Sequence, residues 1–204
     1  MPKFFKSLTL VLATLLFAAP ALAQTPDPAV QTVEKFYDAL LDSMKNAKAL
    51  GAKGRYEKLK PAVETAYDLP TMTGLSVGPT AWAGLSAADK KSLTDAFERL
   101  TVSSYAGNFD GFSGEKFTVE PTAQVRGNDK LVKSALVPAG GKPIPFIYRL
   151  RQSSGSWKII DVLLNGEVSQ LAQRRSDFSA SFQAGGAAGL AKKIDELADK
   201  QLGQ

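Results

Sequence analysis

The side chains of this sequence that could do chemistry are carboxylates and tyrosines, because the 204-residue chain contains neither cysteine nor histidine. Disulfides, cysteine nucleophiles, Ser-His triads and the usual ligands of transition metals are therefore excluded. An aspartate base and a tyrosine donor can still move protons inside an apolar pocket, and Asp110, Asp161 and Tyr148 are candidates for those roles. No spacing forces these three residues together, and no DxDxDG-type calcium loop is present. We expect no catalytic residue, no metal, no cofactor and no enzymatic activity.

The first 23 residues have the pattern of a secretory signal peptide. Lys3 and Lys6 precede an apolar run from Leu8 to Ala19, and Ala21-Leu22-Ala23 is an A-x-A cleavage site. The alternative is an uncleaved membrane anchor, but the apolar run is shorter than the roughly 20 residues that span a bilayer. We expect cleavage before Gln24 and export to the periplasm.

The remaining residues, 24–204, have the composition of one globular domain. The whole chain is 44% hydrophobic and 9% aromatic, which is enough for a core. Removal of residues 1–23 takes away two lysines and no acids, so 23 basic residues face 20 acidic ones and the formal charge falls from +5 to +3. Because the basic residues are spread along the chain and form no stripe with interleaved aromatics, we expect no nucleic-acid partner.

Apolar spacing predicts helices in the first half of this domain. Pro61 should kink the second helix or mark its real start. The predicted elements are a helix over 28–48, a glycine-containing loop over 49–54, a helix over 55–67, a short helical segment from Asp68 to Gly78, a turn around Trp82 and a helix over 87–106.

After Gly107 the apolar period changes from 3.6 to 2, which indicates four strands joined by short turns. The first strand, 117–125, is interrupted by Pro121 and should lie at an edge or contain a bulge. Three further strands over 131–137, 144–150 and 157–164 are followed by helices over 168–182 and 190–202, separated by Gly185-Gly186. We expect an α+β fold in which helices pack on one face of a curved four-stranded antiparallel sheet.

This arrangement resembles the NTF2-like shape, in which a concave sheet and helices can enclose an apolar pocket. Ketosteroid-isomerase-type enzymes use the same shape, so an isomerase or lyase acting on a hydrophobic small molecule is an alternative function. Large apolar residues on the helices and the aromatic third strand fit a pocket or a solid core, and composition does not choose between them. The predicted lining comprises Tyr37, Leu40, Leu41, Met44, Leu59, Val63, Tyr67, Met72, Leu75, Trp82, Phe97, Leu100, Tyr105, Ile144, Phe146, Tyr148, Leu150, Trp157 and Ile159.

An ordered set of motifs across most of the mature chain resembles the MlaC-type periplasmic lipid-binding proteins, also called the toluene-tolerance family. That family shows a pattern of the form YxL…GxWKIxDVxxxGVS…RxxF. The matching residues are Tyr148-Arg149-Leu150, the run from Gly155 to Val162, Gly166, Val168-Ser169, Arg175 and Phe178, with Asp68, Met72, Trp82, Phe97 and Tyr105 upstream. The chain departs from the pattern at Asn165 in place of an acid, at an additional Glu167, and at Arg174 in place of an aromatic residue.

The resemblance implies a soluble, monomeric carrier that shuttles a lipid between the inner and outer membranes and touches them transiently. Its implied partners are an inner-membrane lipid transport complex of the ABC transporter type and an outer-membrane complex. The segment 37–61 looks like the hopanoid-associated HpnM branch, so the cargo is a hopanoid or a phospholipid. A scaffold that only bridges envelope complexes is a further alternative.

Two pairs of residues have open roles. By strand parity Trp157 and Asp161 share a face, where they could form a lid and a polar anchor or could simply pack. Arg174 and Arg175 could hold a lipid head group or an acidic partner, or could lie on a solvated helix face.

Overall fold

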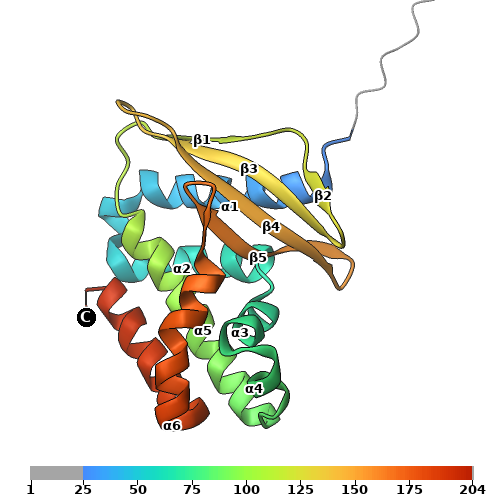
Figure 1. The fold of residues 1–204 in the computed structure, drawn as a ribbon. Coiled ribbons are helices and arrows are strands. Elements are labelled where there is room, and N and C mark those ends of the chain that lie inside the picture. Colours follow the sequence, from blue (N-terminus) through green and yellow to red (C-terminus); the bar gives the residue numbers. More distant parts are fainter. Residues whose placement is uncertain (1–24, 204) are drawn as a thin grey trace, which may run out of the picture.

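The computed structural model describes residues 25–203, so the predicted signal peptide, 1–23, lies outside the described residues. Figure 1 shows one sheet with the helices gathered on one of its faces. This confirms the predicted α+β class with helices on one face of an antiparallel sheet. The helices are α1 (Pro28–Lys45), α2 (Ala47–Ala66), α3 (Leu69–Val77), α4 (Pro79–Ala83), α5 (Ala87–Asn108) and α6 (Gln170–Gln201). Within the described part of the chain, none of these helices is long and apolar enough to cross a bilayer.

Helix α1 begins where local chemistry requires it. The side chain of Asp27 accepts a hydrogen bond from the backbone N–H of Ala29 at 2.9 Å, and Pro28 occupies the first helical position. Its apolar positions recur at helical spacing and are buried, among them Val33, Tyr37 and Leu40. This buried face packs against the sheet and α2.

The predicted loop over 49–54 is wrong, because α2 already begins at Ala47. A single residue, Gly51, departs from helical geometry with φ 61° and ψ −178°. Such a conformation is readily adopted only by glycine, so the chain changes direction at one residue and stays helical on both sides. Pro61 lies inside α2 and does not mark its start.

The sheet contains β1 (Lys116–Val119), β2 (Gln124–Arg126), β3 (Asp129–Val137), β4 (Ile144–Ser153), β5 (Ser156–Leu164) and β6 (Val168–Ser169), in the order β1-β3-β4-β5-β6. Strand β2 also pairs with β3, so β1 and β2 are two parts of the predicted first strand, separated around Pro121 at the sheet edge. The predicted number of strands was too low. The helix predicted from Val168 begins only at Gln170, and the two residues before it form β6.

Trp157 and Asp161 do not share a face of the sheet as predicted, because β5 contains a β-bulge between them. Asp161 lies opposite Arg149 in the ladder, but the next pair along β4 is Leu150 with Ile159, so β5 holds one extra residue. Side chains beyond the bulge change face. Trp157 therefore shares the helix-facing side of the sheet, and Asp161 lies on the opposite side.

Helix α6 has a break at Gly186, with φ 58° and ψ −152°. The predicted separation of two terminal helices at Gly185-Gly186 is thus correct in position. Figure 1 shows the first half of α6 running away from the sheet and the second half returning beside it. Helix α5 packs along α6, and a Cβ on Gly107 would come within 2.4 Å of the carbonyl oxygen of Gln201.

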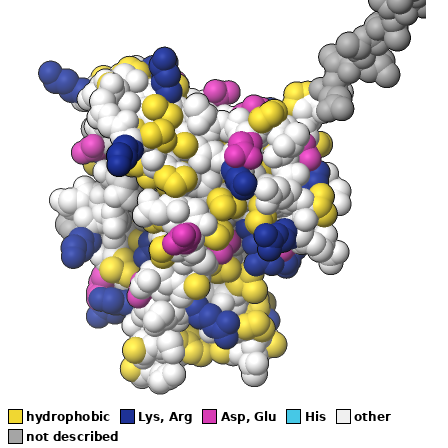
Figure 2. Space-filling model, turned by 45° about the horizontal axis from the view of Figure 1, so that its top comes forward, with side chains coloured by type: hydrophobic (Ala, Val, Ile, Leu, Met, Phe, Trp, Pro, Cys, Tyr) yellow, Lys and Arg dark blue, Asp and Glu magenta, His cyan; other side chains and the backbone are white. Residues whose placement is uncertain are grey.

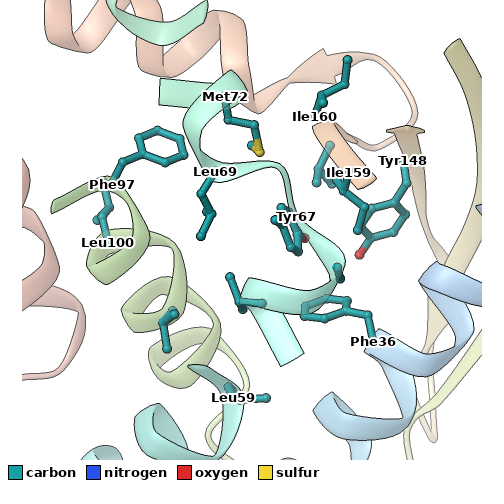
Figure 3. Packing of buried hydrophobic residues seen from close by; sticks show 14 of the residues in the cluster. Phe36, Leu59, Tyr67, Leu69, Met72, Phe97, Leu100, Tyr148, Ile159 and Ile160 are labelled. Carbon is teal, nitrogen blue, oxygen red and sulfur yellow. The ribbon is translucent and has the colours of Figure 1, made fainter. Parts of the chain in front are cut away.

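The core lies between the sheet and the helices. Figure 3 shows Tyr148 and Ile159 from the sheet facing Phe36 of α1 and Tyr67, the extended residue that follows α2. On the surface that Figure 2 shows, lysine and arginine side chains are dispersed among acidic and apolar ones.

Candidate functional site

A partly open cavity of about 160 Å³ lies between the inner face of the sheet and the helices. Its lining residues come from α1, the α2–α3 junction, α3, α5 and the residue after it, β1, the β4–β5 pair and the start of α6. Most lining groups are aromatic or aliphatic. Of the predicted lining residues, the structure brings together at this cavity Tyr37, Tyr67, Met72, Phe97, Tyr105, Phe146 and Tyr148.

Aromatic contacts hold the wall of this cavity together. The ring of Tyr37 stacks on Phe117 with centroids 4.2 Å apart, and meets Tyr148 edge-on at 5.6 Å. The rings of Phe36 and Tyr105 also meet edge-on, with their centroids 4.9 Å apart. Such pairs contribute about 0.5–1.5 kcal/mol each beyond their burial. They connect α1, α5 and two strands across the cavity wall.

The tyrosine hydroxyl groups give the wall a few polar points. The hydroxyl of Tyr37 lies 2.7 Å from Oγ of Ser134, and the hydroxyls of Tyr67 and Tyr105 share a hydrogen bond. Burial raises the pKa of the Tyr67 hydroxyl and that of the Tyr148 hydroxyl well above the ordinary value for tyrosine. These phenols therefore stay neutral, and they offer hydrogen bonds without negative charge.

The polar part of the lining comes from α5 and the start of α6. Thr101 and Ser104 line the cavity, but their hydroxyls donate to the carbonyls of the residues four positions earlier, each at 2.8 Å. Asn108, Gln170 and Arg174 are the other polar lining residues. Burial lowers the pKa of the Arg174 guanidinium from its ordinary value.

Asp161 determines where α6 begins. Its Oδ2 accepts from the hydroxyl of Ser169 at 2.6 Å, and its Oδ1 accepts from the backbone N–H groups of Val162 at 2.8 Å and Leu171 at 3.0 Å. The hydroxyl of Ser169 in turn accepts from the N–H of Ala172 at 3.0 Å, as a helix cap does. Asp161 is thus a structural carboxylate that holds the first turn of α6 against the cavity.

The three residues considered for proton transfer are not brought together. Tyr148 lines the cavity, whereas Asp161 lies on the opposite side of the sheet and Asp110 is exposed in the loop after α5. Within the described part of the chain, the cavity lining contains no carboxylate.

The other predicted lining residues lie elsewhere. Some are packed in the solid core, some are half-buried away from the cavity, and Ile144 is 40% exposed near the sheet end. The core group is Leu40, Met44, Leu59, Val63, Leu100, Leu150 and Ile159. The half-buried group is Leu41, Leu75 and Trp82.

Trp157 lies at a second depression, of about 600 Å³, between the start of α1, the end of α2 and the β4–β5 turn. The ammonium of Lys130 lies 4.6 Å from the indole centroid, and the hydroxyl of Thr32 donates to the carbonyl of Trp157 at 3.0 Å. Lys35 and Lys158 also line this depression, which is wider and more polar than the cavity. Trp157 is therefore no lid over the aromatic cavity.

Sequence reasoning missed several lining residues. Thr101, Ser104 and Asn108 follow Phe97 at helical intervals and could have been found by extending that face to polar positions. Val162 and Leu164 required knowledge of the bulge in β5. The remaining missed residues are Phe109, Phe117, Gln170, Leu171 and Arg174.

The solved structures that match include a phospholipid-binding protein from Ralstonia solanacearum in complex with a phospholipid, with a TM-score of 0.74 and 21% sequence identity. The match covers 87% of this chain and 100% of that chain, and at this identity it shows a shared fold. A comparison with curated proteins finds no match. The family model described as MlaC protein matches residues 34–196, which include every residue of the cavity lining, and the chain therefore belongs to the MlaC family.

Proposed function

We propose that this protein is a lipid carrier that shelters an apolar chain in the cavity between its sheet and its helices. The observation that carries the proposal is the mostly apolar, aromatic lining of the cavity, which contains neutral phenols and no carboxylate among the described residues. Each exposed CH₂ group costs about 0.8 kcal/mol in water, so a chain of about 15 such groups costs about 12 kcal/mol. The phospholipid held by the Ralstonia solanacearum protein supports a lipid as the ligand.

The cavity must enlarge to accept such a chain. Its volume of about 160 Å³ lies below the roughly 300–1,000 Å³ of pockets for drug-sized ligands. An engineered cavity of about 150 Å³ holds a molecule the size of benzene. We infer that the described conformation is a closed form. Met72, which has a flexible unbranched side chain, is a lining residue that can adapt when the lipid enters.

The route of the lipid is also part of the proposal. The sequence pattern of residues 1–23 supports export to the periplasm with cleavage before Gln24. We propose that the mature chain works as a monomer, that it takes lipid from an inner-membrane transport complex and delivers it to an outer-membrane partner, and that it touches membranes only transiently. A phospholipid and a hopanoid are the two proposed cargoes.

The test is native mass spectrometry and lipid extraction on the protein purified from the periplasm of its own organism. A co-purifying phospholipid or hopanoid supports the carrier and identifies its cargo. Protein that is empty as isolated should be refolded without lipid and exposed to vesicles of phosphatidylglycerol and phosphatidylethanolamine, with and without hopanoid. If the refolded protein has its native circular dichroism spectrum and still takes up no lipid, the proposal is wrong.

A further inference from the structure

We propose that Arg174 binds the anionic group of the lipid and makes the cavity selective for lipids that carry a phosphate. This inference rests on the proposed carrier function and adds the class of lipid. It assigns a role to a residue that lies at the junction between the apolar cavity and the first turns of α6.

The first support is the position of Arg174. It lies on the same side of α6 as Gln170 and Leu171, one turn further along, and all three line the cavity. The contacts of Asp161 with Ser169 and Leu171 fix this turn. The guanidinium is therefore held at the cavity by a defined helix start.

The second support is that the guanidinium of Arg174 has no acidic partner among the described residues. Arg174 is half-buried, and within residues 25–203 its guanidinium makes no hydrogen bond or ion pair. Other arginines that are buried or half-buried have partners in the same part of the chain. Arg55 donates to two backbone carbonyls, Arg99 pairs with Asp195 and Asp199, and Arg149 and Arg151 pair with Asp129.

Among residues 25–203, no carboxylate forms an ion pair with the Arg174 guanidinium. Asp177 is the acid whose charge reaches it, but its Oδ1 accepts from Nε2 of Gln173 at 2.9 Å. A desolvated guanidinium without a partner is costly, and a phosphate would satisfy it through two parallel charge-assisted hydrogen bonds.

The surroundings fit a lipid head group. The side-chain amides of Gln170 and Asn108 line the same cavity and can supply further hydrogen bonds. The rest of the lining is mostly aromatic and aliphatic, with Tyr148 and Leu164 from the sheet as examples. A ligand with one anionic group and an apolar chain matches this distribution, whereas an uncharged apolar ligand would leave Arg174 unpaired.

The test compares two lipids that differ in the phosphate group. Delipidated full-length mature protein is incubated with vesicles of digalactosyldiacylglycerol, a host lipid without phosphate, that contain either phosphatidylglycerol or diacylglycerol with the same acyl chains, and bound lipid is measured by mass spectrometry. R174Q removes the charge at the cavity. R175Q removes the same charge from the next residue, which is exposed and does not line the cavity. R174K keeps a positive charge but loses the planar guanidinium group that can donate two parallel hydrogen bonds.

We expect R174Q to lower uptake of phosphatidylglycerol by about tenfold or more, since hydrogen bonds to charged groups are the stronger class, and to leave diacylglycerol uptake unchanged. R175Q should behave like the natural protein, and R174K should lie in between. The inference is overturned if R174Q keeps the natural preference, or if R175Q loses as much. A natural protein that takes up neither lipid would overturn the carrier function itself. If R174Q fails to fold, R174K is the test of the inference. An R174K variant that keeps the full preference for phosphatidylglycerol over diacylglycerol would contradict a bidentate contact between Arg174 and the phosphate.

Discussion

The hydroxyl of Tyr37 on α1 lies 2.7 Å from Oγ of Ser134 on β3, so a single hydrogen bond connects the first helix to the sheet at the cavity wall. Both residues are buried. Oγ of Ser134 also lies 3.5 Å from the carbonyl oxygen of Phe146, which is the longer and weaker contact. At the other end of the same pair of elements, the ammonium of Lys130 on β3 donates to the carboxylate of Asp27, the N-cap of α1, at 2.7 and 2.9 Å.

Tyr37→Phe should lower the free energy of unfolding by about 1 kcal/mol, because a buried hydrogen bond is lost while the ring keeps its stack on Phe117. Lipid uptake should be retained. Urea unfolding measures the first quantity, and mass spectrometry of bound lipid measures the second. Ser134→Ala is the matched variant. The double variant should cost little more than either single one, and strictly additive losses would show that the two hydroxyls do not interact.

Ser104 offers a way to fill the cavity without removing any of its aromatic wall. Ser104→Trp places an indole in a space of about 160 Å³, and we expect bound lipid per protein to fall at least fivefold. Ser92→Trp is the control, because Ser92 lies on the exposed side of the same helix. Native mass spectrometry after exposure to vesicles measures both variants. Equal lipid content in the two variants would place the lipid outside this cavity.

The main architecture could be predicted from local patterns. Helical spacing in α1 and α5, alternation in the strands and the Pro121 interruption are properties of neighbouring residues, so they are visible without any knowledge of tertiary contacts. The break at Gly185-Gly186 is another such local signal. This explains why the α+β class and the order of its elements follow from sequence.

The site could be predicted only in part, because a cavity depends on which faces meet. The extra residue in β5 places Asp161 on the other side of the sheet from Trp157, and no local pattern in that strand indicates a bulge. Gly51 redirects the chain at one position where six loop residues were expected. Gln170 and Arg174 line the cavity because of the way α6 packs against it. Both residues are polar, so the spacing of apolar residues does not indicate this position.

Asp161 is expected to support the cavity through α6. Asp161→Ala removes an acceptor of three hydrogen bonds and should lower the free energy of unfolding by about 2–3 kcal/mol. Lipid uptake should fall as well, because the first turn of α6 loses its attachment. Ser169→Ala, which removes only the cap, should cost about 1 kcal/mol. Chemical unfolding measures both, and an Asp161→Ala variant as stable as the natural protein would contradict this role.

Asp129 should make the stability depend on pH. Arg151 and Arg149 donate to its carboxylate, with Nε–O distances of 2.6 Å each, and hold its pKa below the usual value. A carboxyl whose pKa is depressed in the folded state contributes stability above its unfolded pKa of about 3.9, and this contribution is lost as the pH falls through the folded pKa. We therefore expect Asp129→Asn to be less stable than the natural protein by about 1–2 kcal/mol at pH 7.

The difference between the natural protein and Asp129→Asn should stay nearly constant from pH 7 to about pH 5 and shrink below about pH 4, since protonated aspartic acid resembles asparagine in charge. Urea unfolding at pH 7, 5, 3 and 2 measures it. Arg151→Gln is the matched variant, because it removes one of the two guanidinium partners and should lose part of the same pH-dependent stability. A difference that is as large at pH 2 as at pH 7 would mean that the charge of Asp129 does not stabilise the fold.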